Sequence, residues 1–248
     1  MTIDPGRRLT ERMTSSERDQ SFPDSEPRDA ATVMLIDRAG AKPKVLLGRR
    51  HSGHKFMPGK FVFPGGRIEA LDRSMSAVSE LHPDTQAKLL VRVVDPSPEL
   101  ARGFALAAVR ELAEETGLLL GAQGDTAPAT PGEIWEEFAK AKVHPDLGQV
   151  HFIARAITPP KRPKRFDTRF FTADATGIAH KIEGVVGPDS ELVELVWVPI
   201  EEAATFDMPT ITSVVLEELA ARVDAGMAHA LPVPFYFMEN QRFFRELL

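Results

Sequence analysis

The sequence contains no cysteine among its 248 residues. This absence excludes a disulfide framework, a zinc site built on thiolates and a cysteine nucleophile. Long apolar runs are also missing, whereas a membrane-spanning helix requires about 20 predominantly apolar residues. We therefore expect no membrane-spanning helix and no membrane partner, and a cytoplasmic location is the default expectation.

A basic excess is likewise absent. The chain has 30 Lys and Arg residues against 36 Asp and Glu residues, which gives a formal net charge of −6. Domains that bind nucleic acids generally show a basic excess, so we expect no nucleic-acid partner. A small molecule that carries phosphates remains compatible, because a local basic patch is sufficient to bind it.

The chain divides into a polar start and a globular remainder. Residues 1–29 carry many acidic side chains and no apolar stretch, so we expect a mobile tail without a secretory signal. Residues 30–248 predict a single domain, since 43% hydrophobic residues can form a sizeable core. Within this domain, residues 73–96 read as a helical insertion.

Strands and helices alternate along this domain without strict repetition, which favours an α/β/α sandwich around a mixed sheet. The longest helix is expected to begin after Ser97, with Pro98 in its first position, and to end at Gly117. Strands are predicted at 30–37, 45–50, 61–63, 150–157, 166–173 and 192–198, and further helices at 75–81, 84–93, 132–141, 201–205 and 209–224.

The end of the longest helix carries a cluster of acidic residues, R-E-L-A-E-E-T-G-L at 110–118. Glu111 precedes Glu114 by three residues and Glu115 by four, so their side chains share one face of the helix. Like charges so placed repel, and acids at a helix C-terminus oppose the helix dipole. A solvated helix end is one interpretation; a site for Mg²⁺ or Mn²⁺, which prefer oxygen ligands, is the other.

Together with Phe63-Pro64-Gly65-Gly66, this string resembles the Nudix hydrolase signature G-x5-E-x7-R-E-U-x-E-E-x-G-U, where U is aliphatic. The first glycine corresponds to Gly66, and the second half corresponds to residues 110–118. Two departures stand out: Asp72 replaces the first glutamate, and residues 73–109 occupy a gap where the pattern allows seven residues. A box split in this way resembles the branch that includes the peroxisomal coenzyme A diphosphatases.

Two flanking stretches support that branch. Residues 46–66 resemble its coenzyme A signature L-L-T-x-R-[SA]-x3-R-x3-G-x3-F-P-G-G, although Gly48, His51 and Lys55 replace the usual threonine, small residue and arginine. Residues 158–171 are similar to its T-P…R-F-D-T-x-F-F segment. The resemblance covers roughly residues 30–220 and implies the Nudix-type sandwich already favoured by the pattern of elements.

The resemblance also implies roles for the box. Metal ligands would be Glu111, Glu114, Glu115 and a backbone carbonyl of Gly65 or Gly66. Catalytic roles fall to Glu115, Glu114 and Arg110, with Arg110 restraining the carboxylates rather than touching substrate. The general base is left open among Glu115, Glu183, Glu191 and Glu194, and Asp72 is either an outer helper of the metal or the end of a turn.

Substrate contacts rest on two basic runs, from which we select Arg50, Lys55, Arg165 and Arg169 as phosphate-binding candidates. Each run could equally be a solvated loop. The sequence thus predicts a Mg²⁺- or Mn²⁺-dependent pyrophosphohydrolase of coenzyme A or acyl-CoA that yields 3′,5′-ADP and a 4′-phosphopantetheine product. The alternatives are ADP-ribose, NADH or dinucleoside polyphosphates as substrates, and a catalytically silent Nudix binding module. A homodimer is compatible with all of these.

Overall fold

The computed structural model describes residues 5–16, 18–54 and 57–248. Its helices are α1 (Pro5–Ser15), α2 (Pro83–Leu89), α3 (Pro98–Thr116), α4 (Trp135–Ala141), α5 (Ile200–Ala203) and α6 (Thr210–Asp224). Its strands are β1 (Arg28–Asp37), β2 (Lys44–Arg50), β3 (Phe61–Val62), β4 (Gly65–Arg67), β5 (Leu118–Leu120), β6 (Ala122–Gln123), β7 (Val143–His144), β8 (His151–Ile157), β9 (Phe166–Asp174), β10 (Ile178–Lys181), β11 (Leu192–Pro199), β12 (Pro234–Glu239) and β13 (Arg242–Leu247).

The main sheet is mixed, as the sequence predicted. In the described residues its main path runs β11-β2-β1-β9-β8-β12-β13, with β3 paired to β2 and β4 to β1. Strand β1 pairs in parallel with β9 and antiparallel with β2 and β4, and β12 pairs in parallel with β8. The short pairs β5–β10 and β6–β7 lie outside this sheet.

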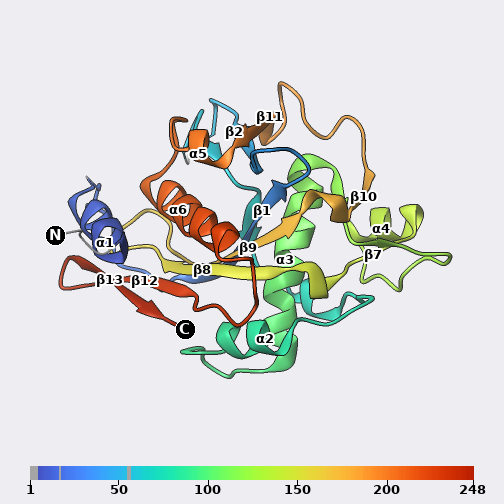
Figure 1. Ribbon diagram of the computed structural model, residues 1–248, viewed down its shortest axis with the longest axis horizontal. Helices are drawn as coiled ribbons and strands as arrows, with labels where there is room; N and C mark the ends of the chain where they lie inside the picture. The colour runs from blue at the N-terminus through green and yellow to red at the C-terminus, as the bar shows by residue number, and fades with distance from the viewer. Residues whose placement is uncertain (1–4, 17, 55–56) are drawn as a thin grey trace.

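Helices cover both faces of the sheet (Figure 1). Along β1, Val33 and Leu35 belong to the core that surrounds α3, whereas Met34 and Ile36 belong to the core formed with α6. Neighbouring side chains of a strand point to opposite faces, so this alternation places α3 and α6 on opposite sides. The resulting α/β/α sandwich confirms the predicted fold class.

Helix α3 begins and ends as its sequence predicts. The Ser97 hydroxyl accepts a hydrogen bond from the Leu100 N–H at 3.1 Å, and Gly117 ends the helix with a left-handed φ of 75°. A Cβ at Gly117 would lie 2.4 Å from the carbonyl oxygen of Ile182, so glycine is required on two counts. These ends fix the position of the acidic cluster against the sheet.

The N-terminal segment differs from the expected mobile tail. Residues Pro5–Ser15 form α1, whose Leu9 and Met13 are both 4% exposed and pack into the core shared with α6. Thr14 Oγ1 accepts a hydrogen bond from the Phe243 N–H of β13 at 3.0 Å. Two apolar residues four positions apart thus dock a helix that is otherwise polar.

The insertion at 73–96 is only partly helical. Helix α2 is shorter than the predicted 84–93, and the helix predicted at 75–81 is wrong, because that segment is extended and Ser79 bridges to Asp146. Arg102 of α3 holds the segment through the Met75 carbonyl at 3.2 Å. The insertion therefore packs along α3.

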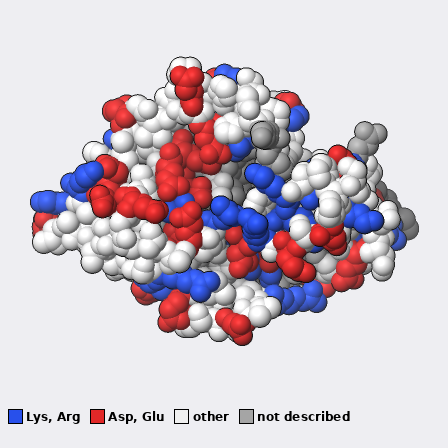
Figure 2. Space-filling model, turned by 180° about the vertical axis from the view of Figure 1, so that it is seen from behind, with Lys and Arg blue, Asp and Glu red and all other residues white. Residues whose placement is uncertain are grey.

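None of the helices in the described ranges is long and apolar enough to cross a membrane. On the face shown in Figure 2, acidic side chains gather on one side of a hollow, and Lys and Arg side chains lie beside them.

Candidate active site

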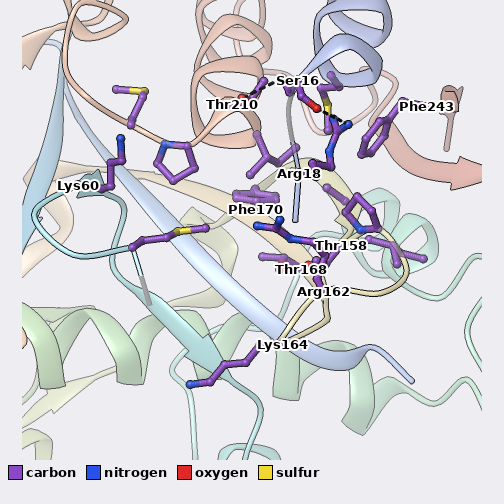
Figure 3. Close-up of a pocket in the computed structure, with 18 residues that line it drawn as sticks. Ser16, Arg18, Lys60, Thr158, Arg162, Lys164, Thr168, Phe170, Thr210 and Phe243 are labelled. Atoms are coloured by element: carbon purple, nitrogen blue, oxygen red, sulfur yellow. Dashed lines mark hydrogen bonds between the residues drawn. The ribbon is translucent and has the colours of Figure 1, made fainter. Parts of the chain in front are cut away.

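A cavity of about 420 Å³ lies where the glycine turn, the end of α3, β9 and the start of α6 meet. Its lining includes Gly66, Glu111, Glu115, Arg50 and Glu191. A second cavity of about 430 Å³ adjoins it and shares part of its wall (Figure 3). The structure thus brings the two halves of the split box together, although residues 67–109 separate them along the chain.

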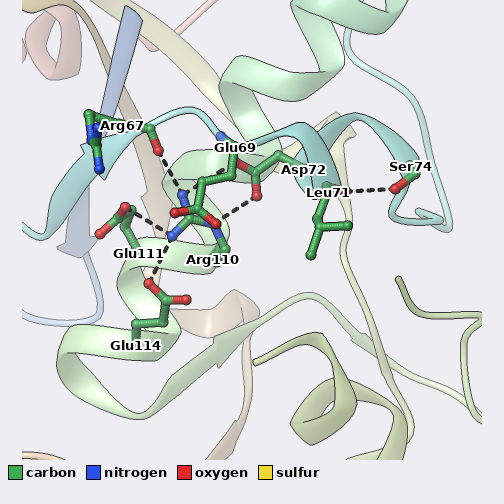
Figure 4. A network of polar contacts seen from close by, with 8 residues as sticks. All are labelled: Arg67, Glu69, Leu71, Asp72, Ser74, Arg110, Glu111 and Glu114. Carbon is green, nitrogen blue, oxygen red and sulfur yellow. Dashed lines mark hydrogen bonds and ion pairs between the residues drawn. The ribbon is translucent and has the colours of Figure 1, made fainter. Parts of the chain in front are cut away.

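Arg110 is the hub of this arrangement (Figure 4). Its buried guanidinium donates to Asp72 at 2.8 Å, to Glu111 at 2.9 Å, to Glu114 at 2.8 Å and to the Arg67 carbonyl at 2.7 Å. Burial opposes the charged form, yet the hydrogen bond to Asp72 and the nearby carboxylates outweigh it and raise the pKa of Arg110. Arg110 therefore positions the acidic residues and does not line the cavity itself.

Asp72, which directly precedes the insertion, is the other buried member of this network around Arg110. It is fully buried, and its carboxylate also accepts the Glu69 N–H at 2.8 Å in a capping box at the start of the Ala70–Ser74 3₁₀ helix. The sequence left its role open between a helper of the metal and the end of a turn. The structure gives it the second role together with an anchor for Arg110.

Glu111 and Glu115 are the acidic residues of the box that face the cavity. Glu115 is 7% exposed, and its Oε2 is buried without a hydrogen-bond partner. Burial, Glu191 and Glu111 raise the pKa of Glu115 well above its usual value, while burial chiefly raises that of Glu111 to about 7. Two carboxylates are therefore held together, out of water and without full compensation.

Gly66 lies directly against this pair. A Cβ at Gly66 would be 2.2 Å from Glu111 Oε1, so any larger residue would displace the carboxylate. Glu114 is placed differently, because its half-exposed side chain turns to Arg110 and is absent from the cavity lining. Burial raises the pKa of Glu114 as well, and Arg110 opposes that rise.

The three candidate acids that follow the box differ in their position relative to the cavity. Glu191 lines the cavity and pairs with Arg50 at 2.8 Å, which places both beside Glu115. Glu194 pairs with Arg49 and Glu183 with Lys181, and both of these carboxylates are well exposed. Glu191 is thus the late acid that the fold brings to the box.

Two of the substrate candidates, Arg165 and Arg169, do not line the cavity. Arg169 is 1% exposed, lies over the Phe104 ring at 3.8 Å and pairs with Asp29 at 2.6 Å, so it stabilises the core. Arg165 holds the segment before β1 through Asp24 at 2.8 Å. Lys55 lies outside the described residues. Of the four, Arg50 is the one that lines the cavity among the described residues.

A divalent cation fits the donors at this site. Glu115 Oε2 is a buried oxygen without a partner, and Glu111 lies beside it. The backbone of the glycine turn adjoins both side chains, with Gly66 against Glu111 and Gly65 bonded to Glu115. Hard oxygen donors of this kind suit Mg²⁺ or Mn²⁺. No group of three or more acidic or histidine side chains is arranged as a ready metal cluster in the part of the chain that the structure describes. A backbone carbonyl or water would therefore complete the coordination.

Sequence reasoning missed the part of the cavity wall formed by Phe170, Ile211 and Thr158. Phe170 is only 7% exposed, yet it lines the cavity. No local pattern marks such residues, because the meeting of β9, α6 and the loop after β8 is set by the tertiary fold.

Taken together, these features define a mixed-sheet α/β/α protein whose longest helix brings buried carboxylates to a glycine turn at the floor of a cleft. This is the Nudix fold. A crystal structure of a Nudix hydrolase from Alicyclobacillus acidocaldarius is 28% identical, with a TM-score of 0.62 over 84% of this chain and 97% of that one.

The sequence comparison agrees. A Caenorhabditis elegans protein, provisionally named nudix hydrolase 7, is 27% identical over 156 residues, which cover 58% of this chain and 43% of that protein. The chain therefore matches less than half the length of that relative. No family model matches the chain. The chain is thus similar to Nudix hydrolases both in sequence and in fold.

A more distant likeness is the NUDIX domain of Shewanella oneidensis NrtR complexed with ADP ribose. It is 15% identical, with a TM-score of 0.44 over 90% of this chain and 99% of that one.

Proposed function

We propose that the protein is a Mg²⁺- or Mn²⁺-dependent hydrolase of a diphosphate linkage. The observation that carries the proposal is the burial of Glu111 and Glu115 side by side on the cavity floor, with one Glu115 oxygen lacking any partner. Buried carboxylates of like charge are costly for a fold, and a bound cation offsets that cost.

The proposed roles follow from position. A bound divalent cation supplies the positive charge that offsets the diphosphate oxygens and makes a water molecule a better nucleophile. Glu111, Glu115 and the Gly66 carbonyl would hold it, and Arg110 keeps Glu111 and Glu114 in place. Glu115 is the proposed acceptor of the proton from the attacking water, and Glu191 is another carboxylate of the cavity lining that could accept it.

Coenzyme A or an acyl-CoA is the favoured substrate, with 3′,5′-ADP and (acyl-)4′-phosphopantetheine as products. Support comes from the register of residues 46–66 with the coenzyme A signature and from Arg50 of that segment, which lines the cavity. His51 and Lys55 depart from the signature. ADP-ribose, NADH and dinucleoside polyphosphates are therefore the competing substrates.

A chromatographic product screen tests the proposal. The purified protein is incubated with Mg²⁺ and separately with Mn²⁺, against CoA, acetyl-CoA, ADP-ribose, NADH and a diadenosine polyphosphate. We expect 3′,5′-ADP from the CoA compounds at the highest kcat/KM. If another compound is cleaved to AMP at a higher kcat/KM, coenzyme A is not the preferred substrate, but the assignment as a diphosphatase stands.

Matched variants separate chemistry from binding. Glu115→Gln is expected to abolish metal-dependent turnover, whereas Glu194→Gln, an exposed acid paired with Arg49, is expected to leave it intact. Glu191→Gln distinguishes the proton acceptor, because loss of kcat equal to that of Glu115→Gln would transfer the role to Glu191. Absence of turnover with every substrate and either metal would instead support a silent Nudix binding module.

A further inference from the structure

The second cavity lies against the first and is built partly by the N-terminal segment (Figure 3). The two cavities share Thr158, Thr168, Phe170 and Ile211 in their linings, so a ligand can extend from one into the other. With about 430 Å³, the second cavity is as large as the first and falls in the size range of small-molecule sites. Nothing in the diphosphate chemistry itself uses this space.

Helix α1 supplies one wall. Met13 and Ser16 line the cavity, and Ser16 Oγ donates to Thr210 Oγ1 of α6 at 3.1 Å. Arg18 follows, with its guanidinium carbon 5.0 Å from the ring centroid of Phe243 in β13. The wall is therefore formed by docked secondary structure and not by a free chain end.

Two guanidinium groups face this space from different segments. Arg18 donates to the carbonyl oxygens of Thr14 at 3.3 Å and Ser16 at 2.8 Å, and Arg162 donates to the Asp19 carbonyl at 3.1 Å. Within the described ranges neither guanidinium lies within ion-pair distance of a carboxylate. Burial and the charge of Arg162 lower the pKa of Arg18 from its usual value, which shows that the two cations repel.

The other charged groups around the cavity do not cancel this charge. Lys60 is already paired with Asp207 at the rim, and Lys164 lines both cavities. Asp19 is fully exposed, and its pKa is lowered chiefly by Ser21, with a smaller contribution from Arg162. The apolar side chains of Met13, Phe170 and Phe243 limit the water around the guanidinium groups, which strengthens their attraction for an anion.

We propose that this second compartment binds a non-scissile phosphate of the substrate, held by Arg18 and Arg162. A phosphate monoester matches the planar fork of arginine and is attached to an organic group that the apolar wall can cover. The inference rests on the proposed function, because it treats the compartment as an extension of the diphosphate site. The proposal restricts the substrates to diphosphates in which one of the two linked groups carries a further phosphate.

Binding of products without turnover tests the proposal. Isothermal titration in EDTA compares 3′,5′-ADP with AMP, which differ by one phosphate. We expect the full-length protein to bind 3′,5′-ADP about tenfold more tightly, as one additional charge-assisted contact pair predicts. Arg18→Gln and Arg162→Gln are each expected to reduce this ratio to about threefold or less, and Arg18→Lys to retain most of it.

The control is Arg7→Gln, which removes a cation of α1 that pairs with the exposed Glu11 outside the compartment. It should leave the tenfold ratio unchanged. Arg162 belongs to the loop between β8 and β9, so its variant tests the site even if Arg18→Gln loosens α1. Thermal melts of all variants identify any such loosening.

Steady-state kinetics give a second readout. With CoA, Arg162→Gln should raise KM about tenfold at unchanged kcat, while KM for dephospho-CoA should stay within about twofold. Equal affinity of the wild-type protein for 3′,5′-ADP and AMP, or a ratio that survives both glutamine variants, overturns the proposal. A preference for acyl-CoA over CoA that Met13→Ala removes, without dependence on the 3′-phosphate, would assign the compartment to an apolar chain instead.

The two proposals fail in different ways. If the protein hydrolyses diphosphates but does not prefer 3′,5′-ADP over AMP tenfold, the proposed hydrolase activity stands and the proposed phosphate site in the second cavity is wrong. If the protein prefers 3′,5′-ADP over AMP tenfold but hydrolyses no diphosphate, the proposed phosphate site stands and the proposed hydrolase activity is wrong.

Discussion

Arg110 Nε lies 2.8 Å from Asp72 Oδ1, although 38 positions separate the two residues in the sequence. Both side chains are essentially buried, at 2% and 0% exposure. This pair connects the glycine turn to the acidic end of α3 and so sets the geometry of the cavity floor.

We predict that Asp72→Asn destabilises the protein by about 3–5 kcal/mol, because the variant leaves a buried guanidinium without its main partner. Urea unfolding at pH 7 measures the change. Arg102→Met, on the same helix but paired with the exposed Glu80, should cost about 1 kcal/mol or less. Equal costs for the two variants would show that Asp72 is not the anchor.

The glycine turn offers a matched pair of substitutions. Gly66→Ala places a methyl group 2.2 Å from Glu111 Oε1, the mobile end of a side chain, so Glu111 shifts while the fold survives. We expect a loss of about 100-fold in kcat/KM with little change in stability. Gly65→Ala meets the backbone oxygen of Ala31 at 2.6 Å and should cost about 1–3 kcal/mol in folding free energy. Activity assays and thermal melts distinguish the two outcomes.

Glu115 is expected to lower the stability of the metal-free protein, although it is a proposed metal ligand. Its replacement by glutamine removes a buried charge that faces Glu111 and Glu191, so the metal-free protein should gain about 1 kcal/mol, or about 2–4 °C in Tm. Calorimetry in EDTA measures the gain. Added Mg²⁺ or Mn²⁺ should raise the Tm of the wild-type protein and not that of the variant. A lower Tm for the variant in EDTA would contradict this account.

The stacked histidines His151 and His229 lead us to expect that the protein loses stability as the pH falls. His151 lies 4.0 Å from His229 between ring centroids, and burial, followed by the charges of His229, Arg222, Arg38 and His82, lowers its pKa to about 4. Between pH 6.5 and 4 the unfolded state therefore binds a proton that the folded state does not, so stability falls as the pH falls through this window.

Urea unfolding at pH 7.0, 5.5 and 4.5 measures that loss. His151→Phe should reduce it, because the variant has no imidazole to protonate in the unfolded chain. His180→Gln, which changes an exposed histidine, should retain the wild-type dependence. An unchanged slope in His151→Phe would assign the acid sensitivity to carboxylates elsewhere.

Local signals predicted the parts of the fold that local chemistry determines. Helix α3 follows from Ser97, Pro98 and Gly117, and the strands of the central sheet follow from their apolar runs. The helix expected at 75–81 is wrong because Ser79 bonds to Asp146, a partner that its own sequence does not reveal. The acidic cluster was recognisable as a motif, whereas its anchoring by Asp72 depends on tertiary contacts.

The two ends of the chain were the least predictable. Helix α1 has few apolar residues, and its docking depends on α6 and β13. The hairpin of β12 and β13 turns through Asn240 and Gln241, both with positive φ, without the asparagine–glycine pair that usually marks such a turn. Its parallel pairing with β8 is a contact that no local sequence pattern specifies.

The hydrogen bond from the Phe243 N–H to Thr14 joins the first helix to the last strand. The two residues lie 229 positions apart, so this contact closes a very long loop of the chain. The cavity wall that includes Arg18 and Phe243 therefore forms only when α1 and β13 have both packed against α6, so the acidic box can be in place while the cleft is still unfinished.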